Sequence, residues 1–282
     1  MLEVINFCAG TQMKFLPISE DVLLKCIDSF YAFWPQPFPG QERLKNCKIV
    51  SHRGEHDNVN IFENTCAAFD KASQSNVWGI ECDLRWTKDL QPVINHDPDL
   101  VRIFGLDTTI CDVTLAELKS ACSQVPSLKE VIQRFGKKLH IMLEVKQEGY
   151  PDPVHQNRVL ADMFACLEPG ADFHLLTLTP NMFQVINCVP KSAFIPIARV
   201  NLREFSQLAL KERYGGVAGH YFLLSKALLR EHHRAQQKVG SGYCSSKNCL
   251  FRELNRGIEW IFSNNAATIQ AIVDQLLKTD AI

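Results

Sequence analysis

Charged and ionisable side chains stand near the ends of four short apolar segments of this sequence. They are His52 and Arg53, Glu81 and Asp83, His96, and Glu144 and Lys146. A strand buried in a parallel sheet normally reads as a continuous apolar run, because each buried charge must be compensated. Charged residues inside such runs therefore indicate a functional site.

Three of these residues are carboxylates that two strands would bring together. Glu81 and Asp83 are two residues apart, so on a strand they point to the same face, and Glu144 lies on a separate segment. This oxygen-rich group suits Mg²⁺ or Ca²⁺, whereas Zn²⁺ usually recruits histidine or cysteine. Without an ion the carboxylates would repel one another and lose hydration. The alternative is a structural ion-pair network with Arg53, Lys146 and Arg85.

The same segments supply two permanent cations and two histidines. Together with a divalent ion, Arg53 and Lys146 would give the pocket a net positive charge, which suits an anion. An arginine and a lysine together favour phosphate, because the guanidinium can bind two oxygens at once. His52 and His96 titrate near neutral pH, so one can act as a base and the other as an acid.

Other polar residues have weaker signals. Glu63, Asn64 and Thr65 open a predicted helix, where either Asn64 or Thr65 caps it or the segment supports the pocket. Asp97 is expected to orient a loop or close a turn rather than to take part in catalysis. The remaining seven histidines are interpreted as solvated or structural, and only His220 lies near the end of a predicted strand.

Short apolar runs alternate with amphipathic stretches from residue 48 onward. Strands are predicted at 48–52, 78–84, 139–146, 173–178, 193–199, 214–222, 238–244 and 258–263, and helices at 63–73, 127–135, 155–167, 181–188, 202–210, 225–237, 249–257 and 268–278. Residues 92–97 form an extra arm, a hairpin that turns near Asp89. Eight β/α units predict an α/β fold, the TIM (β/α)8 barrel, whose active site lies at the carboxyl ends of the strands. A doubly wound sheet is the alternative, but no glycine-rich nucleotide-binding fingerprint is present.

The chain has 282 residues, of which 46% are apolar and 22% charged, with a net charge of -1. This balance predicts a globular protein and argues against nucleic-acid binding. The eleven cysteines include no C-x-x-C pair and are interpreted as reduced thiols. We expect no secretory signal and no transmembrane segment, and hence a cytoplasmic protein.

Residues 1–47 precede the alternating pattern. Ser19 can cap a helix over 20–34, and the proline-rich run that follows ends it. We predict that 1–47 form an N-terminal helical extension packed on the barrel, and that 48–282 form the barrel itself. A lid or a partner-binding arm is the alternative for the extension.

The order of motifs resembles the glycerophosphodiester phosphodiesterase family. The runs are SHRG, ENT, IECDLRWTKDLQPVINHD and LEVK, within residues 48–146. The resemblance implies a metal-dependent TIM barrel of the phospholipase C-like phosphodiesterase type, which hydrolyses a small glycerophosphodiester to an alcohol and glycerol 3-phosphate. The short stretch from His96 to Pro126 resembles the compact, cytoplasmic type.

Carried over by motif, the resemblance implies a role for each site residue. These are His52 and His96 as the acid/base pair, Glu81, Asp83 and Glu144 as ligands of Mg²⁺ or Ca²⁺, and Arg53 and Lys146 as phosphate contacts. We assign the base to His52 and the acid to His96, an order that could be exchanged.

The C-terminal half departs from the family pattern. The family often has a W-T-V-N strand end and a final I-x-T-D, where this chain has GYCSS at 242–246 and IFSN at 261–264. These positions shape the alcohol and glycerol pockets. The alternatives are therefore a lysophospholipase D-like or phosphoinositide-type phosphodiesterase on the same core, or a binding protein without activity.

Overall fold

The structure is a computed structural model, which describes residue 27 and residues 29–279. Eight parallel strands form a closed barrel, because β1 pairs with both β2 and β11. They are β1 (Lys48–His52), β2 (Gly79–Trp86), β6 (His140–Val145), β7 (Phe173–Thr177), β8 (Phe194–Ala198), β9 (Gly216–His220), β10 (Lys238–Gly242) and β11 (Trp260–Ser263). The predicted TIM barrel and its eight strands are confirmed.

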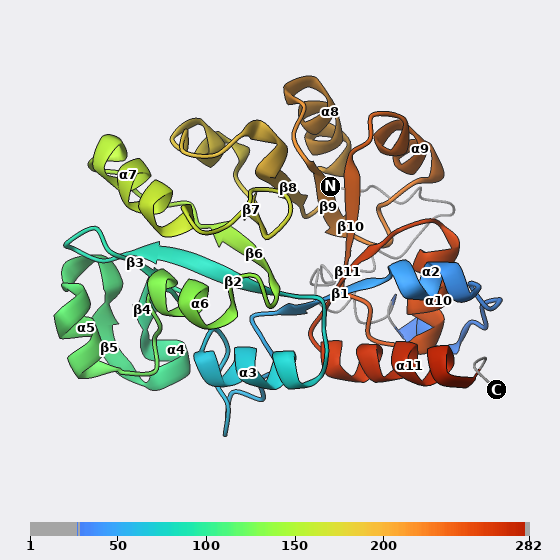
Figure 1. Cartoon of the computed structure of the whole chain (residues 1–282), viewed down its shortest axis with the longest axis horizontal. Coiled ribbons are helices and arrows are strands. Elements are labelled where there is room, and N and C mark those ends of the chain that lie inside the picture. The colour runs from blue at the N-terminus through green and yellow to red at the C-terminus, as the bar shows by residue number, and fades with distance from the viewer. Residues whose placement is uncertain (1–26, 28, 280–282) are drawn as a thin grey trace, which may run out of the picture.

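Helices surround the barrel on all sides (Figure 1). They are α3 (Cys66–Gln74), α6 (Leu128–Phe135), α7 (Pro153–Phe164), α8 (Leu202–Glu212), α9 (Lys226–Arg234), α10 (Lys247–Asn255) and α11 (Ala266–Thr279). Side-chain caps begin several of them: Thr65 accepts from the Ala68 N–H and Ser127 from the Glu130 N–H. These side-chain hydrogen bonds fix the residue at which each of the two helices begins.

The predicted helix at 181–188 is wrong. The segment between β7 and β8 contains only a 3₁₀ turn, η2 (Pro180–Gln184), and a second short one, η3 (Lys191–Ala193). The side chain of Asn157, on α7, forms hydrogen bonds with the backbone of this segment. It donates to the Val185 carbonyl at 2.7 Å and accepts from the Asn187 N–H at 2.7 Å. A side chain from a neighbouring helix thus satisfies groups that an α-helix would pair internally.

The predicted hairpin arm is confirmed and carries a small subdomain. β3 (Pro92–Ile94) pairs antiparallel with the end of β2, and the Leu90 N–H donates to the Thr87 carbonyl in the turn. After it come β4 (Asp99–Leu100), α4 (Val101–Phe104), β5 (Leu106–Thr109), η1 (Ile110–Asp112) and α5 (Leu115–Ala121). This subdomain has its own apolar cluster, which includes Leu118 and Val125. It supports the arm from outside the barrel.

Inward-facing residues change character along the barrel axis. On β6 they are His140, Met142 and Glu144, in that order from the amino to the carboxyl end. Met142 belongs to the apolar cluster that fills the middle of the barrel, with Val50 and Leu176. The carboxyl end is therefore charged and the middle is apolar.

A pair of histidines closes the amino end of the barrel. His140 Nε2 lies 2.8 Å from His174 Nδ1, and His140 Nδ1 lies 2.9 Å from the Ala171 carbonyl. Because that carbonyl can only accept, His140 carries its proton on Nδ1 and His174 donates to the free Nε2. Trp78 stacks on His140 at 4.1 Å, and both histidines are buried.

Acidic pH should weaken the fold through this histidine pair. Burial lowers the pKa of His140 to about 4 and that of His174 to about 3. In the unfolded chain a histidine has a pKa of about 6.5, so above that pH the neutral pair costs the folded protein nothing. As the pH falls from there toward 4, the free energy of unfolding decreases by up to about 1.4 kcal/mol per pH unit for each histidine. His174→Gln should flatten the fall in the free energy of unfolding, measured by urea titration across this range.

His233→Gln is the matched control, because His233 lies exposed on α9. It should keep the pH dependence of the unchanged protein. An equally steep fall in the His174→Gln variant would show that the pair does not titrate as described.

The described part of the N-terminal segment follows α10 from one end to the other. Asn248, in the first turn of α10, donates to the Ala32 carbonyl at 2.8 Å, and Asn255, at its last residue, donates to the Pro37 carbonyl at 2.8 Å. Helix α2 (Gln41–Asn46) then leads into β1. The predicted helix over 20–34 lies mostly outside the described residues, although residues 29–33 are helical.

We propose that residues 1–47 stabilise the barrel. Their removal should lower the midpoint of thermal unfolding or cause aggregation, because Tyr221 and Phe251 would lose the ring contacts they make with Tyr31 and Phe38. Calorimetry of the shortened chain measures this. Unchanged stability together with altered substrate preference would indicate a lid instead.

Candidate active site

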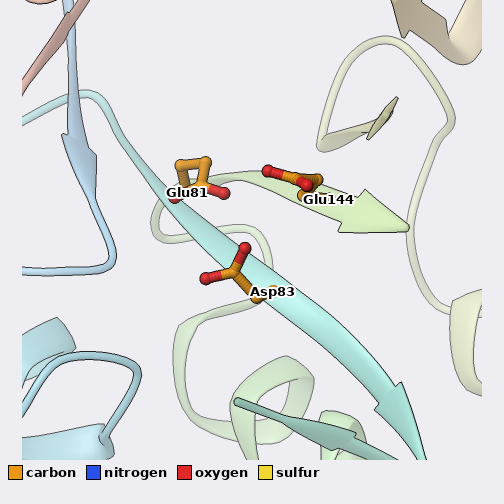
Figure 2. Close-up of side chains that lie close together, drawn as sticks. All are labelled: Glu81, Asp83 and Glu144. Carbon is orange, nitrogen blue, oxygen red and sulfur yellow. The ribbon is translucent and has the colours of Figure 1, made fainter. Parts of the chain in front are cut away.

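The three predicted carboxylates meet at the carboxyl end of the barrel. Asp83 of β2 and Glu144 of β6 are directly paired in the sheet register, and Glu81 lies two residues before Asp83. One oxygen from each of the three lies within 4.8 Å of the others. Figure 2 shows the three side chains converging from the two strands. All three are buried, so their mutual repulsion is poorly screened by water.

Two cations compensate part of this charge. Lys146 Nζ lies 2.8 Å from both Asp83 Oδ1 and Glu144 Oε1, and Arg53 Nε lies 3.3 Å from Asp83 Oδ2. Burial alone would raise the pKa of Asp83, but the ammonium and the guanidinium hold it below its ordinary value. Part of the ion-pair network considered as the alternative in the sequence analysis is therefore present, around Asp83.

Glu81 is left without equivalent compensation. Burial, together with Asp83 and Glu144, raises its pKa well above the ordinary value. Its Oε2 accepts from the Arg53 N–H at 3.1 Å, but its Oε1 has no hydrogen-bond partner among the described residues. A buried carboxylate oxygen without a partner, beside two further carboxylates, is the donor set that Mg²⁺ or Ca²⁺ prefers. These residues fit a divalent ion.

His52 points into this cluster from the end of β1. Its Nδ1 lies 2.6 Å from Asn264 Oδ1, which makes Nδ1 the protonated nitrogen because an amide oxygen only accepts. Its Nε2 lies 3.7 Å from Glu81 Oε2 and 3.4 Å from the Tyr243 hydroxyl. Burial and the neighbouring Arg53 lower the pKa of His52 to about 4. The imidazole is therefore neutral, with the lone pair of Nε2 on the side of the cluster.

His96 reaches the same region from the hairpin arm. Its Nδ1 lies 2.7 Å from Asp97 Oδ1, and its carbonyl accepts from Arg85 Nη2 at 2.6 Å. Arg102 holds Asp97 in place and also binds Glu63, at 2.6 Å. Burial lowers the pKa of His96, against the raising effect of Asp83 and Asp97. Asp97 thus orients the imidazole ring itself, which goes beyond the loop role expected from the sequence.

Glu63 and Asn64 support the site and do not cap α3. The cap is Thr65, while Asn64 Nδ2 donates to Asp83 Oδ2 at 2.7 Å. Glu63 accepts from Arg53 Nη1 at 3.0 Å, and its pKa is lowered to about 2 because the hydrogen bond from Arg102 and the charge of Arg53 outweigh its burial. Both residues therefore position the charged groups around Asp83.

Three residues of this network were not found from the sequence. Tyr243 and Asn264 both contact His52, and Arg102 contacts Asp97. Tyr243 and Asn264 lie in the two C-terminal segments that depart from the family pattern, and that departure was the available signal. Arg102 lies in the subdomain that follows the hairpin, for which no motif was recognised.

Comparisons with known proteins bear on the same region. Residues 52–171 match the glycerophosphoryl diester phosphodiesterase family. The matched segment is 120 of the 282 residues, and over it the chain is similar to that family. The match contains the whole arrangement of His52, Glu81, Asp83, His96 and Glu144.

Curated relatives of the family match over the same part of the chain. A glycerophosphodiester phosphodiesterase of Caldanaerobacter subterraneus is 34% identical over 110 residues, which are 35% of this chain and 44% of that protein. A human lysophospholipase D is 35% identical over 106 residues, 31% of this chain and 33% of the human protein. The matching segment thus spans less than half the length of each relative.

Solved structures extend the likeness to the whole barrel. A glycerophosphodiester phosphodiesterase from Thermotoga maritima has a TM-score of 0.64 at 22% identity, over 80% of this chain and 98% of that one. A phosphodiesterase from Oleispira antarctica, solved with sn-glycerol-3-phosphate, has a TM-score of 0.63 at 20% identity, over 80% and 96%. At these identities the comparison establishes the fold of the barrel.

Among the helices that the structure describes, none combines the length and the apolar character needed to cross a bilayer.

Divalent ions should stabilise this protein through Glu81. An ion that binds only the folded protein adds about 2.7 kcal/mol at a hundred times its Kd, so excess Mg²⁺ or Ca²⁺ should raise the midpoint of thermal unfolding. Glu81→Gln should abolish that rise. The same variant should unfold at a higher temperature than the unchanged protein in chelator, because it removes a buried, repelled carboxylate.

Glu212→Gln is the control, since Glu212 pairs with Lys191 on the surface at 2.7 Å. It should retain the full ion-induced rise. If ions raised the midpoint of the Glu81→Gln variant equally, they would bind elsewhere.

Proposed function

We propose that the chain is a divalent-metal-dependent phosphodiesterase that hydrolyses glycerophosphodiesters to an alcohol and glycerol 3-phosphate. The observation that carries this proposal is the unpartnered buried oxygen of Glu81, set among Asp83 and Glu144 with His52 beside it. The names of the family and of its curated relatives agree with the proposal. The glycerol 3-phosphate in the Oleispira structure agrees with the proposed product.

Glu81, Asp83 and Glu144 would hold the ion, either Mg²⁺ or Ca²⁺. Bound there, it would polarise a phosphoryl oxygen and orient the diester. Arg53 and Lys146 would contact the other phosphate oxygens, since both cations already lie at the carboxylate cluster. Their positive charge also favours binding of an anionic diester over a neutral ester.

The partners of the two histidines support a division of proton transfer. Burial and the neighbouring Arg53 lower the pKa of His52 more than the Asn264 hydrogen bond raises it, so its Nε2 carries the lone pair that can accept a proton. His96 bonds to the carboxylate of Asp97, which favours the protonated ring. We therefore assign the base, which activates water or a substrate hydroxyl, to His52. The acid that protonates the leaving alcohol is His96.

Leaving-group acidity tests this assignment. His96→Ala should lose about 10²–10⁴-fold in kcat/KM on glycerophosphocholine, because choline must gain a proton as the P–O bond breaks. The same variant should lose much less on a glycerol p-nitrophenyl phosphodiester, whose leaving group needs no proton. His52→Ala should lose activity on both substrates.

The reverse pattern between the two variants would exchange the roles of His52 and His96. Equal losses on both substrates for both variants would leave the histidines as binding groups only. His155→Ala is a suitable control, because the His155 side chain contacts Arg158 on α7.

A lysophospholipase D-like activity is the second candidate. The human relative carries that name, and two large side chains, Phe222 and Tyr243, lie exposed in loops that follow β9 and β10. Phosphorus NMR of a panel of diesters, from glycerophosphocholine to lysophosphatidylcholine, with and without ion, separates the two substrate classes. Turnover of no diester in the presence of Mg²⁺ or Ca²⁺ would favour the binding protein.

We also propose a cytoplasmic location. The state of the cysteines supports it, because Cys82, Cys244 and Cys249 are buried free thiols. A reducing compartment keeps such thiols intact.

A further inference from the structure

An aromatic face and a basic groove lie side by side on the described part of the N-terminal segment and the two helices next to it. The aromatic face consists of Phe30, Phe33 and Trp34, which are 56%, 85% and 58% exposed. The basic groove lies between α9 and α10 and has a volume of about 630 Å³. The residues that line it include Gln36, Leu224, Lys226, Arg230, Arg252 and Arg256. Neither surface belongs to the candidate active site.

The segment that carries the aromatic face is held firmly. Tyr31 points inward, packs edge-on against Tyr221 at 5.6 Å, and lies under the Arg252 guanidinium at 4.4 Å. Phe30 and Trp34, one helical turn apart, stack on each other at 5.6 Å instead of packing on the barrel. The exposed rings therefore stand on an anchored turn, with their apolar faces toward solvent.

The aromatic face and the basic groove form one continuous surface. Arg252 touches Tyr31 and lines the groove, and Gln36 lines the groove two residues after Trp34. Phe222 adds a further exposed ring, 51% accessible, two residues before Leu224 of the groove.

The groove carries excess positive charge. Its four permanent cations are Lys226, Arg230, Arg252 and Arg256, and the buried carboxylate of Glu253 pairs with Arg252 and Arg256. Lys226 and Arg230 lie exposed, one turn apart on α9. Exposed aromatic rings beside such cations match the two layers of an anionic bilayer surface, the phosphate region and the outermost acyl carbons.

We infer that this surface docks the protein on an anionic phospholipid bilayer. Lys226 and Arg230 face the lipid phosphates, while Phe33 and Trp34 enter the interface beside them. A soluble anion would use the groove alone and would leave the rings exposed. The inference goes beyond the proposed function and does not depend on it.

Docking would bring the mouth of the barrel near the lipid. Asn248, which binds the segment at Ala32, lies in the first turn of α10, directly after the loop that carries Tyr243. Because Tyr243 contacts His52, the aromatic face lies on the side of the barrel where the candidate site opens.

Co-sedimentation of the full chain with vesicles tests the inference. Vesicles of phosphatidylcholine with about 30% phosphatidylserine should bind it, and vesicles of phosphatidylcholine alone should bind much less, with binding weakened by salt. Lys226→Glu/Arg230→Glu should reduce binding at least about tenfold, since each cation near the surface contributes roughly fivefold or more. Phe33→Ser/Trp34→Ser should also reduce it.

A matched control reverses two charges on the opposite side of the barrel. Lys129→Glu/Lys138→Glu changes exposed lysines at α6 and should leave vesicle binding unchanged. Figure 1 shows α6 far across the barrel from α9 and α10. All three double variants should hydrolyse soluble diesters like the unchanged protein, which separates failure of docking from failure of the proposed function.

Fluorescence of Trp34 gives a second readout. Anionic vesicles should shift the emission of the unchanged protein to shorter wavelength, and Trp34→Phe should lose the shift but keep the binding. Equal binding to neutral and anionic vesicles, or none to either, would overturn the inference. Charge-dependent binding of an RNA duplex with no effect of the Phe33→Ser/Trp34→Ser change would also overturn it, in favour of a polyanion site.

Discussion

Three buried carboxylates at one end of a barrel are the constraint on which the site depends. Each would carry a severe desolvation penalty alone, and together they repel one another. Lys146 pairs with two of them, Asp83 and Glu144, and Arg53 pairs with the other oxygen of Asp83. Their compensation is incomplete at Glu81, and this imbalance makes the cluster suited to a cation and an anionic substrate.

The support for this cluster explains several local features of the backbone. Arg53 and Asn64 both adopt the left-handed conformation, with φ of 57°. That conformation lets the Arg53 N–H bond to Glu81 Oε2 while the Asn64 amide bonds to Asp83. Strain of this kind is normally seen where surrounding contacts over-determine the backbone. Here those contacts are the charged groups themselves.

Sequence patterns could predict what depends on one strand or one turn. The two-residue spacing of Glu81 and Asp83 fixed a shared face, and apolar runs located all eight strands. Asn264 and Tyr243 could not be assigned to His52, because their contacts depend on how β10 and β11 close the barrel beside β1. The missing helix between β7 and β8 likewise depends on Asn157, a residue from another element. The pairing of strands far apart in the chain, and hydrogen bonds from a distant side chain to backbone groups, cannot be predicted from the spacing of neighbouring residues.

The two histidines rest on different parts of the structure, and this bears on their chemistry. His52 ends a barrel strand paired on both sides, and its side chain is 15% exposed. His96 ends an arm outside the closed barrel, and its side chain is 31% exposed. A base must meet a water or hydroxyl in one fixed place, which a barrel strand provides. An acid that serves leaving alcohols of different size needs an open side, which the arm provides. The asymmetry of their partners, an amide for one and a carboxylate for the other, therefore agrees with the asymmetry of their positions.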